Sequence, residues 1–435
     1  MISDACTVMF DGIPAGYLAY TDDNGFASFE YTEEWRQDGF SLSPLHLPLS
    51  SQTYTFPALP FETFRGLPAV FADSLPDDFG NALINAWLAR QGLDKSQFMA
   101  IDRLLYTGTR GMGALEYQPT NNPFEDSSQP ILIDELVSMA QKVLDSRDQL
   151  HLSDHEKSSM AKLLQIGTSA GGARAKAVVA VNNDRTEIRS GQVSVPEGFE
   201  HFLLKFDGVE EHKTDRETFG DPKGYGVMEY VYYLMATNAG INMSHCELLR
   251  EEESKRAHFM TKRFDRDGNH KYHVLSLCGM VHADFRKPGA YSYEELLSTA
   301  RQLGLSYKEQ EQIFRRMVFN VIARNHDDHT KNWSFRVNDD YEWELAPAYD
   351  IAWSYKKDSI WVQSHQLSLA GKRDNFNQDD LMSVTEQITG LRRNKAQHII
   401  DETISSVSRW QDLAEEHGVP PELSKSVWNT LRLSW

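Results

Sequence analysis

The segment NHDDHTKN at residues 325–332 places two aspartates between two histidines, directly after a stretch with the apolar spacing of a buried helix. In that stretch, about 308–323, the apolar residues recur at i, i+1, i+4 and i+5, namely Ile313, Phe314, Met317, Val318, Val321 and Ile322. Since this spacing places them on one face, we predict a helix packed in a core. The helix delivers the chain directly into the polar segment, which makes this segment the first candidate for a functional site.

The composition fits a globular protein of two or three domains, with 435 residues, 40% hydrophobic and 25% charged. A net charge of −19 argues against a chain that binds nucleic acid by itself, because phosphate binding needs a basic surface, although a local basic pocket can hold a nucleotide. The three cysteines lie far apart without CxxC spacing, which fits a reducing compartment. No signal-peptide pattern and no apolar run of about 18 residues occur, so we expect a soluble cytoplasmic protein without membrane contact.

The first 125 residues are expected to form a β-rich domain. Residues 5–31 alternate like a small antiparallel sheet, and Asn-Gly at 24–25 is a hairpin signal. A helix is predicted at about 77–92, ending at Gly92, and the polar run 120–130 is the best linker candidate.

Residues 126–265 are expected to form a mixed second region, and residues 266–435 a mostly helical third one. In the second region we predict helices at about 132–144, 154–165 and 226–240, and strands at 175–181, 201–208, 246–251 and 257–264. Near the start of the third region, residues 333–345 are predicted to form a hairpin.

One interpretation of NHDDHTKN is a metal site. His326-Asp327 contains the adjacent His-Asp pair of an HD-type phosphohydrolase, in which a divalent metal lies between histidine and aspartate ligands. That site needs another histidine upstream on a helix, and neither His270 nor His273 nor His282 lies in a convincing helical pattern.

A second interpretation starts from Asp327. Asn332 follows it by five positions, which is the Asp-to-Asn spacing of the kinase catalytic loop H-R-D-x-x-x-x-N. In that loop the aspartate accepts the proton of the substrate hydroxyl and the asparagine holds magnesium. Asp350, after a short hairpin, occupies the place of the second metal ligand. Each of these residues alone could simply cap a helix or turn, but their order after a buried helix favours phosphoryl transfer. Asp328 is then expected to be a spectator and His326 a packing or orienting residue.

Lys205 adds a candidate from the strand HFLLKF, where a charge is costly unless it is paired. Glu229 lies early on the next predicted helix. A lysine on nucleotide phosphates steadied by a helix carboxylate is the arrangement of kinases. The alternative is an edge-strand lysine that points to solvent.

The glycine-rich turn GTSAGGARAK is a candidate phosphate loop. It is not a Walker A loop, because no Lys-Ser/Thr follows the second glycine, and it is not G-x-G-x-x-G. Backbone amides of its small residues could approach phosphate, with Arg174 and Lys176 adding positive charge. The small residues are Ser169, Ala170, Gly171, Gly172 and Ala173. The turn stands just before the strand that precedes the lysine strand, where a nucleotide-covering loop belongs.

Taken together, these segments resemble the HipA family of serine/threonine kinase toxins. The segments that carry the resemblance run through nearly the whole chain in the family's order: SLSPLHLPL, ADSLPDDFGNALI, TSAGGARAKA, HFLLKF, MEYVYYLMATNAGI, TKRFDR, NHDDHTKNWSF and LAPAYDI. The resemblance implies an α+β chain with a divergent protein-kinase-like fold, a β-rich N-terminal part and a mostly helical C-terminal lobe.

The resemblance also implies roles for single residues. Asp327 would be the catalytic base, Asn332 and Asp350 would hold Mg²⁺, and Lys205 would contact the phosphates of ATP. Ser169 matches the serine at which some members autophosphorylate and so shut off their own activity, since a phosphate adds about −1.5 to −2 charge to a loop that must lie over ATP. Thr168 neighbours it, so either residue could carry the phosphate.

Further ATP contacts are implied by two other segments. TKRFD resembles the hinge, so the Lys262 backbone, Phe264 and Asp265 would hold adenine and ribose. His329 and Lys331 fall inside the catalytic loop near the phosphates. Residues 276–289 fill the place of the activation segment with a divergent sequence, so substrate choice does not transfer from the family.

The resemblance implies an ATP- and Mg²⁺-dependent kinase toxin as first hypothesis. Family members phosphorylate an aminoacyl-tRNA synthetase, inhibit growth, and are neutralised by a small helix-turn-helix antitoxin, HipB, that binds operator DNA. The acidic charge agrees with DNA binding only through such a partner. The second hypothesis is a catalytically silent HipA-like binding or co-repressor module, against which the complete set Lys205, Asp327, Asn332 and Asp350 weighs. The third is the HD-type phosphohydrolase.

Overall fold

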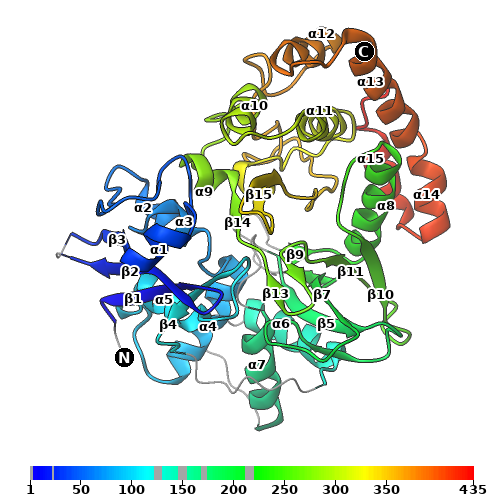
Figure 1. Cartoon of the computed structure of the whole chain (residues 1–435). Coiled ribbons are helices and arrows are strands. Elements are labelled where there is room, and N and C mark those ends of the chain that lie inside the picture. Colours follow the sequence, from blue (N-terminus) through cyan, green and yellow to red (C-terminus); the bar gives the residue numbers. More distant parts are fainter. Residues whose placement is uncertain (1–2, 22–23, 122–129, 146–153, 168–173, 211–219) are drawn as a thin grey trace. The chain divides into compact units, whose positions relative to one another are not determined.

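The computed structural model describes all residues except 1–2, 22–23, 122–129, 146–153, 168–173 and 211–219. The chain divides into two compact units (Figure 1). Unit 1 comprises residues 1–223 and 249–274, and unit 2 comprises residues 224–248 and 275–435. The expected three-part division at 125 and 265 stays a prediction. Within the region 126–265, the segment 224–248 groups with unit 2.

The first sheet of unit 1 has the order β3-β2-β1-β4 and is antiparallel throughout. Its strands are β1 (Ala5–Phe10), β2 (Ile13–Tyr20), β3 (Ala27–Tyr31) and β4 (Leu115–Gln118). The turn between β1 and β2 uses Asp11 and Gly12 at positive φ of 45° and 76°, and Gly25, at φ 79°, precedes β3. The sheet predicted over residues 5–31 is therefore confirmed, with a fourth strand from much later in the sequence.

The helices of unit 1 include the one predicted at 77–92. This helix, α4, starts after Asp77, whose carboxylate caps it by accepting from the Gly80 N–H at 2.6 Å. Among the described residues of unit 1, the helices are α1 (Glu33–Asp38), α2 (Phe61–Phe64), α3 (Ala69–Ala72), α4 (Asp78–Arg90), α5 (Ala100–Thr107), α6 (Ile133–Asp145) and α7 (Asp154–Ile166), with a 3₁₀ turn at Lys95–Gln97.

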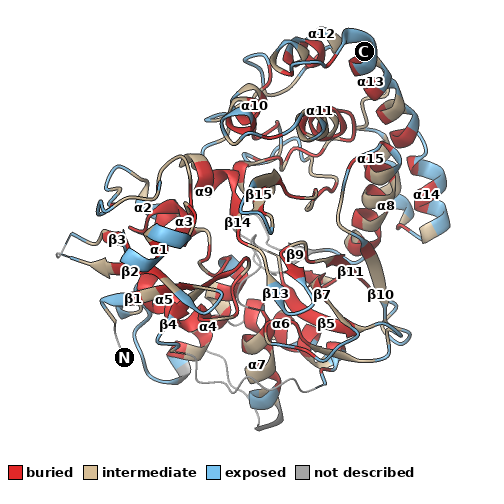
Figure 2. Ribbon diagram, viewed as in Figure 1, coloured by how far each residue is buried: buried red, intermediate tan, exposed pale blue. Residues whose placement is uncertain are grey.

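The second sheet, most of whose residues belong to unit 1, has the order β10-β11-β7-β5-β6. Its strands are β5 (Lys176–Asn182), β6 (Ile188–Ser190), β7 (Phe199–Lys205), β10 (Cys246–Arg250) and β11 (Ala257–Lys262). Apolar side chains of α4, α6 and α7 form one buried cluster with those of β5 and β7. Six consecutive residues of β5 are buried (Figure 2), so its two faces are both covered, which explains a continuous apolar run instead of alternation. Because α4 belongs to the N-terminal part, that part and the second sheet share one core.

Unit 2 is mostly helical, as expected. Its helices are α8 (Tyr225–Asn238), α9 (Leu277–Val281), α10 (Tyr293–Gln302), α11 (Tyr307–Ile322), α12 (Gln378–Ser383), α13 (Arg393–Val407), α14 (Trp410–His417) and α15 (Pro421–Trp428). The predicted helix 308–323 is α11, which a capping box of Ser306 and Glu309 starts. It packs on α10 and α13, and α8 packs on α13 and α14.

The strands of unit 2 form a small sheet of order β14-β15-β16, with β14 at Val274–Ser276, β15 at Ser334–Val337 and β16 at Trp343–Leu345. The hairpin predicted at 333–345 is therefore confirmed. Two-residue ladders elsewhere are β8 (Val209–Glu210) with β9 (Gly220–Asp221) and β12 (Arg266–Asp267) with β13 (His270–Lys271). Residues 351–377, all of them described, contain turns and isolated bridges but no helix.

None of the described helices combines the length and the apolar character that a membrane-spanning helix needs.

Candidate active site

The motif 325–332 begins where α11 ends. Arg324 takes a left-handed conformation, with φ 59°, which turns the chain out of the helix. The Asn325 N–H then donates to the Asn320 carbonyl at 3.0 Å, and the His326 N–H to the Ser354 carbonyl at 3.1 Å. The backbone of the motif is therefore held both by α11 and by the irregular segment that follows the hairpin.

Asp327 and Asn332 close this loop on itself. The Asn332 Nδ2 donates to the Asp327 carbonyl oxygen at 2.7 Å, so the spacing of five residues corresponds to a direct contact. The Asp327 side chain is 40% exposed, and its Oδ1 lies 3.6 Å from His329 Nε2. Since the amide nitrogen of Asn332 is engaged, its oxygen is the group that can act as a ligand.

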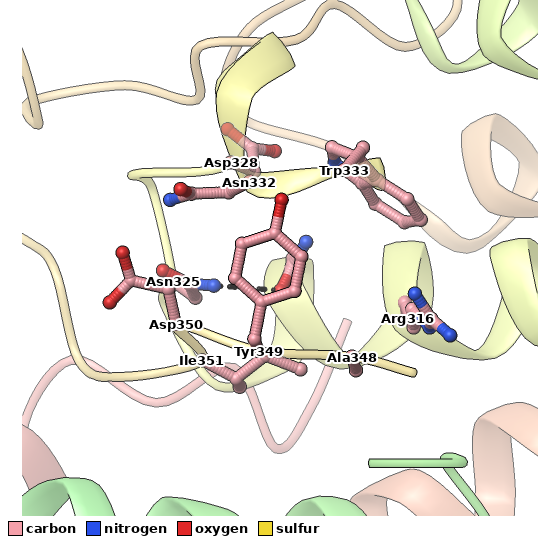
Figure 3. A pocket seen from close by; sticks show the side chains of 10 residues that line it. Arg316, Asn325, Asp328, Asn332, Trp333, Ala348, Tyr349, Asp350 and Ile351 are labelled. Carbon is pink, nitrogen blue, oxygen red and sulfur yellow. Dashed lines mark hydrogen bonds between the residues drawn. The ribbon is translucent and has the colours of Figure 1, made fainter. Parts of the chain in front are cut away.

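Asp350 and Asn332 line one small pocket in unit 2, which is partly open to solvent (Figure 3). Asp350 has φ 55°, a left-handed conformation that costs on the order of 1 kcal/mol or more and tends to persist at functional sites. Asn325 lines the same pocket and carries a buried side-chain oxygen that accepts from no described group. Carboxylate and amide oxygens are the ligands that Mg²⁺ prefers, so these residues fit a magnesium ion.

Tyr349 links two of the segments that line this pocket, and its role was not anticipated from the sequence. Its hydroxyl donates to the Lys331 carbonyl at 2.6 Å and lies 2.5 Å from Ser334 Oγ. It thereby links the residue before Asp350 to the residue before Asn332.

We expect Tyr349→Phe to lower the free energy of unfolding by about 1 kcal/mol, because the Lys331 carbonyl loses its donor. Urea denaturation measures this loss. Tyr17→Phe is the control, since that side chain is 57% exposed and should change stability little. An unchanged urea midpoint in Tyr349→Phe would show that the hydroxyl does not hold the pocket together.

Asp328 is not the spectator that we expected. Its side chain is 1% exposed, and its carboxylate accepts from the Tyr293 hydroxyl at 2.5 Å, His365 Nδ1 at 2.8 Å and the Gln366 N–H at 2.7 Å. Because an ionised carboxylate can only accept, His365 must carry its proton on Nδ1. Asp328 therefore anchors the loop to α10 and to the segment 351–377, while Asp327 faces outward.

His326 is buried in packing, as expected. Its ring lies 4.2 Å from the ring of His365, its Nδ1 is 3.1 Å from the Val362 carbonyl, and its Nε2 is 3.3 Å from Arg324 Nη1. Burial, followed by the neighbouring His365 and Arg324, lowers the pKa of His326 well below its usual range. With both ring nitrogens engaged, His326 is not placed to ligate a metal. The described residues hold no group of three or more His, Cys, Asp and Glu side chains suited to a metal ion, so the phosphohydrolase hypothesis gains no support.

His329 and Lys331 both contact Phe285. The ring of Phe285 lies 5.5 Å from that of His329, and the Lys331 ammonium is 5.1 Å from its centroid. Thr330, between them, donates from Oγ1 to the Ala283 carbonyl at 2.9 Å. The 3₁₀ turn Thr330–Asn332 is thus packed on the segment 276–289.

Lys205, in unit 1, is a buried lysine of a central strand. It is 5% exposed, directly opposite Lys176 on β5 and Phe259 on β11, and its ammonium is 5.7 Å from the Phe259 ring centroid. The alternative of an edge-strand lysine pointing to solvent is therefore wrong. Lys176 lies 3.5 Å from the buried carboxylate of Asp77, a partner that sequence reasoning missed.

Glu229 is 1% exposed on α8 and belongs to unit 2. Its pairing with Lys205 stays a prediction.

The expected hinge residues have three different environments. The Lys262 side chain is 43% exposed and forms an ion pair with Glu200. Phe264 is half-buried. Asp265 is completely buried.

The carboxylate of Asp265 is fully used inside unit 1. It accepts from Arg263 Nε at 2.8 Å and Nη2 at 2.6 Å, from Arg266 Nη1 at 2.9 Å, and from the Gly113 N–H at 2.7 Å. Despite the opposing effect of burial, the two guanidinium groups hold the pKa of Asp265 well below its usual range. This geometry does not fit the expectation that Asp265 contacts adenine or ribose; its role is to join the chain near residue 265 to the turn before β4. Lys262 and Phe264 stay predicted contacts.

Ser169, Ala170, Gly171 and Gly172 of the glycine-rich turn, with Thr168, lie outside the described residues. Their expected roles in ATP binding and autophosphorylation stay predictions.

Comparison with known proteins assigns the chain to a family. The family model of the HipA N-terminal domain matches residues 6–118, and that of the HipA-like C-terminal domain matches residues 168–411. Among solved structures, HipA of Shewanella oneidensis MR-1, determined with HipB and operator DNA, matches with a TM-score of 0.66 at 17% identity, over 97% of this chain and 93% of that chain. The proinflammatory kinase CtkA of Helicobacter pylori matches with a TM-score of 0.31 at 14% identity, over 53% of this chain and 92% of that chain, which is too weak to support an argument. No curated protein matches by sequence.

The expected α+β fold with a β-rich N-terminal part and a helical C-terminal lobe agrees with the fold of the S. oneidensis protein. One family model alone spans more than half of the chain, and the other covers most of the part before it. The chain belongs to the HipA family.

Proposed function

We propose that this chain is an ATP- and Mg²⁺-dependent serine/threonine protein kinase of the HipA type. The observation that carries the proposal is the loop in which Asp327 faces outward while Asn332 folds back and shares a pocket with Asp350. A base on one side and oxygen ligands for a cation on the other side are the parts that phosphoryl transfer needs.

In the proposed reaction, the hydroxyl oxygen of a protein serine or threonine forms a bond to the γ-phosphorus of ATP while the bond from that phosphorus to the bridging oxygen breaks, which releases ADP. Asp327 accepts the hydroxyl proton. Asn332 and Asp350 would hold Mg²⁺, which would supply positive charge to the phosphates. Lys205 contacts the phosphates, and His329 and Lys331 add positive charge near them.

We further propose that the chain acts as the toxin of a toxin–antitoxin pair. The S. oneidensis relative was solved with HipB and operator DNA, which supports a HipB-like helix-turn-helix partner here. A net charge of −19 supports DNA binding through that partner alone. The same proposal includes two further points. The protein substrate of this chain is an aminoacyl-tRNA synthetase, as in the family, and the chain phosphorylates itself at Ser169.

Mass spectrometry after incubation with Mg·ATP and a cell extract tests this function. We expect new phosphoserine or phosphothreonine in the wild-type sample, both on the chain and on a target, and none with Asp327→Ala. Incorporation that survives Asp327→Ala would contradict the assignment of the base. No incorporation by wild type would favour the silent binding module, and phosphoester hydrolysis without ATP would favour the phosphohydrolase.

A further inference from the structure

Asn325 presents a buried oxygen to the pocket of Asn332 and Asp350. The residue is 3% exposed, and no described group donates to its Oδ1. A buried carbonyl oxygen without a donor is destabilising, because its desolvation is not compensated, so such groups are rare and call for an explanation. The pocket that this oxygen lines is the one with the expected cation ligands.

A chain of hydrogen bonds fixes which end of the Asn325 amide faces the pocket. Asp328 can only accept, so the Tyr293 hydroxyl donates to it at 2.5 Å. The lone pair of that hydroxyl accepts from Asn320 Nδ2 at 3.1 Å, which turns Asn320 Oδ1 toward Asn325. Asn320 Oδ1 in turn accepts from Asn325 Nδ2 at 2.9 Å, the dashed line in Figure 3.

This polarity cannot be reversed at Asn325 alone. Rotating its amide would bring two acceptor oxygens together and break the bond to Asn320. Asp328 is itself kept as an acceptor by His365 Nδ1 and the Gln366 N–H. The two aspartates that follow in the motif therefore differ in role: Asp327 faces outward, whereas Asp328, which also lines the pocket, fixes the orientation of the amides of Asn320 and Asn325.

We propose that Asn325 is a further residue of the divalent-cation site, whose Oδ1 accepts a hydrogen bond from a water on the cation held by Asn332 and Asp350. This inference rests on the proposed function, because it takes its cation from it. Mg²⁺ keeps several of its waters in proteins, and a water on a cation is a strong donor that requires an acceptor. An asparagine oxygen with a fixed direction supplies that acceptor without adding charge, and Tyr293 and Asp328 are positioning residues for it.

Manganese binding tests the inference without relying on catalysis. The dissociation constant of Mn²⁺ for the full chain, with a non-hydrolysable ATP analogue present, is measured by electron paramagnetic resonance. We expect Asn325→Ala to raise it about tenfold or more, as the loss of outer-shell partners does at other metal sites. Asn325→Asp keeps an oxygen at this place and adds a charge that attracts the cation, although it loses the bond to Asn320 Oδ1, so it should bind Mn²⁺ more tightly than Asn325→Ala. Tyr293→Phe removes the hydroxyl that orients the amides of Asn320 and Asn325. It should raise the dissociation constant of Mn²⁺ by a smaller factor than Asn325→Ala does.

Val321→Ala is the matched control, since Val321 is a fully buried residue of α11 whose truncation loosens packing without touching the amide chain. Its Mn²⁺ affinity should equal that of wild type.

Equal Mn²⁺ affinity of Asn325→Ala and wild type would overturn the inference. Equal losses of affinity in Asn325→Ala, Asn325→Asp and Val321→Ala would overturn it as well. If Asn325→Ala does not fold, an unchanged Mn²⁺ affinity in Tyr293→Phe would contradict the proposed role of the hydrogen bonds that link Tyr293, Asn320 and Asn325. If the wild-type chain binds Mn²⁺ and nucleotide but transfers no phosphate, the proposed kinase activity is refuted, and the comparison of Mn²⁺ affinities among the variants still tests the role of Asn325. If the wild-type chain binds no Mn²⁺, the proposed kinase activity and the role of Asn325 are both refuted.

Discussion

Asp327→Asn should lower the rate constant kcat of phosphoryl transfer by about 10²- to 10⁴-fold, the range that a positioned general base contributes. The side chain is 40% exposed, and Asn332 holds this residue through its backbone carbonyl. The substitution therefore removes the proton acceptor and keeps the loop contact, so the free energy of unfolding should stay within about 0.5 kcal/mol of wild type. Steady-state kinetics with Mg·ATP and urea denaturation measure the two quantities.

Asp340→Asn is the control for this experiment. Asp340 lies in the exposed turn between β15 and β16, so its substitution removes the same charge from unit 2 without touching the pocket. Its kcat should equal that of wild type. A loss of less than tenfold in Asp327→Asn would contradict the assignment of Asp327 as the base.

Asp265→Ala should lower the free energy of unfolding by about 3–5 kcal/mol, the cost of removing one partner from a buried ion pair. Arg263 and Arg266 are 3% and 8% exposed and would lose the carboxylate between them. The Gly113 N–H would also lose its acceptor. Urea denaturation at pH 7 measures the loss, and Asp267→Ala, two residues on and exposed, is the control and should change stability by less than about 0.5 kcal/mol.

The same carboxylate predicts a dependence on pH. Since the folded pKa of Asp265 lies below its unfolded value of about 3.9, its contribution is fully present above that value and is lost as pH falls through the folded pKa. The stability difference between wild type and Asp265→Ala should therefore be constant from pH 7 to about 5 and shrink below about pH 4. A difference that stayed constant down to pH 3 would contradict the low pKa.

The local features of the fold were predictable from the sequence. The helix α11, the hairpin of β15 and β16 and the N-terminal sheet depend on periodicities and turn residues that neighbouring positions provide. The contact between Asn332 and the Asp327 carbonyl belongs to the same class, because it spans five residues of one turn. These features need no information about distant parts of the chain.

The environment of each charged residue was not predictable in this way. Asp265 looked like a hinge residue with access to ligand, yet its acceptor capacity is used partly by Gly113, which is 152 positions away. Lys176 was assigned to a phosphate loop, but it lies against Asp77, the N-cap of a helix almost one hundred positions earlier. Asn325 carried no signal in the sequence, because its orientation depends on Tyr293 and Asp328 through Asn320.

The two adjacent aspartates, Asp327 and Asp328, show which features of the site the sequence determined and which features only the tertiary structure decided. Two features were determined by the sequence alone: the pair follows a buried helix, and one aspartate of the pair stands five residues before an asparagine. Both features depend only on local spacing and helix periodicity. The tertiary structure decided that Asp328 is the buried member, because its partners Tyr293, His365 and Gln366 lie 35, 37 and 38 positions away. A carboxylate can be buried only where such donors converge, and their convergence depends on how α10, α11 and the segment 351–377 pack.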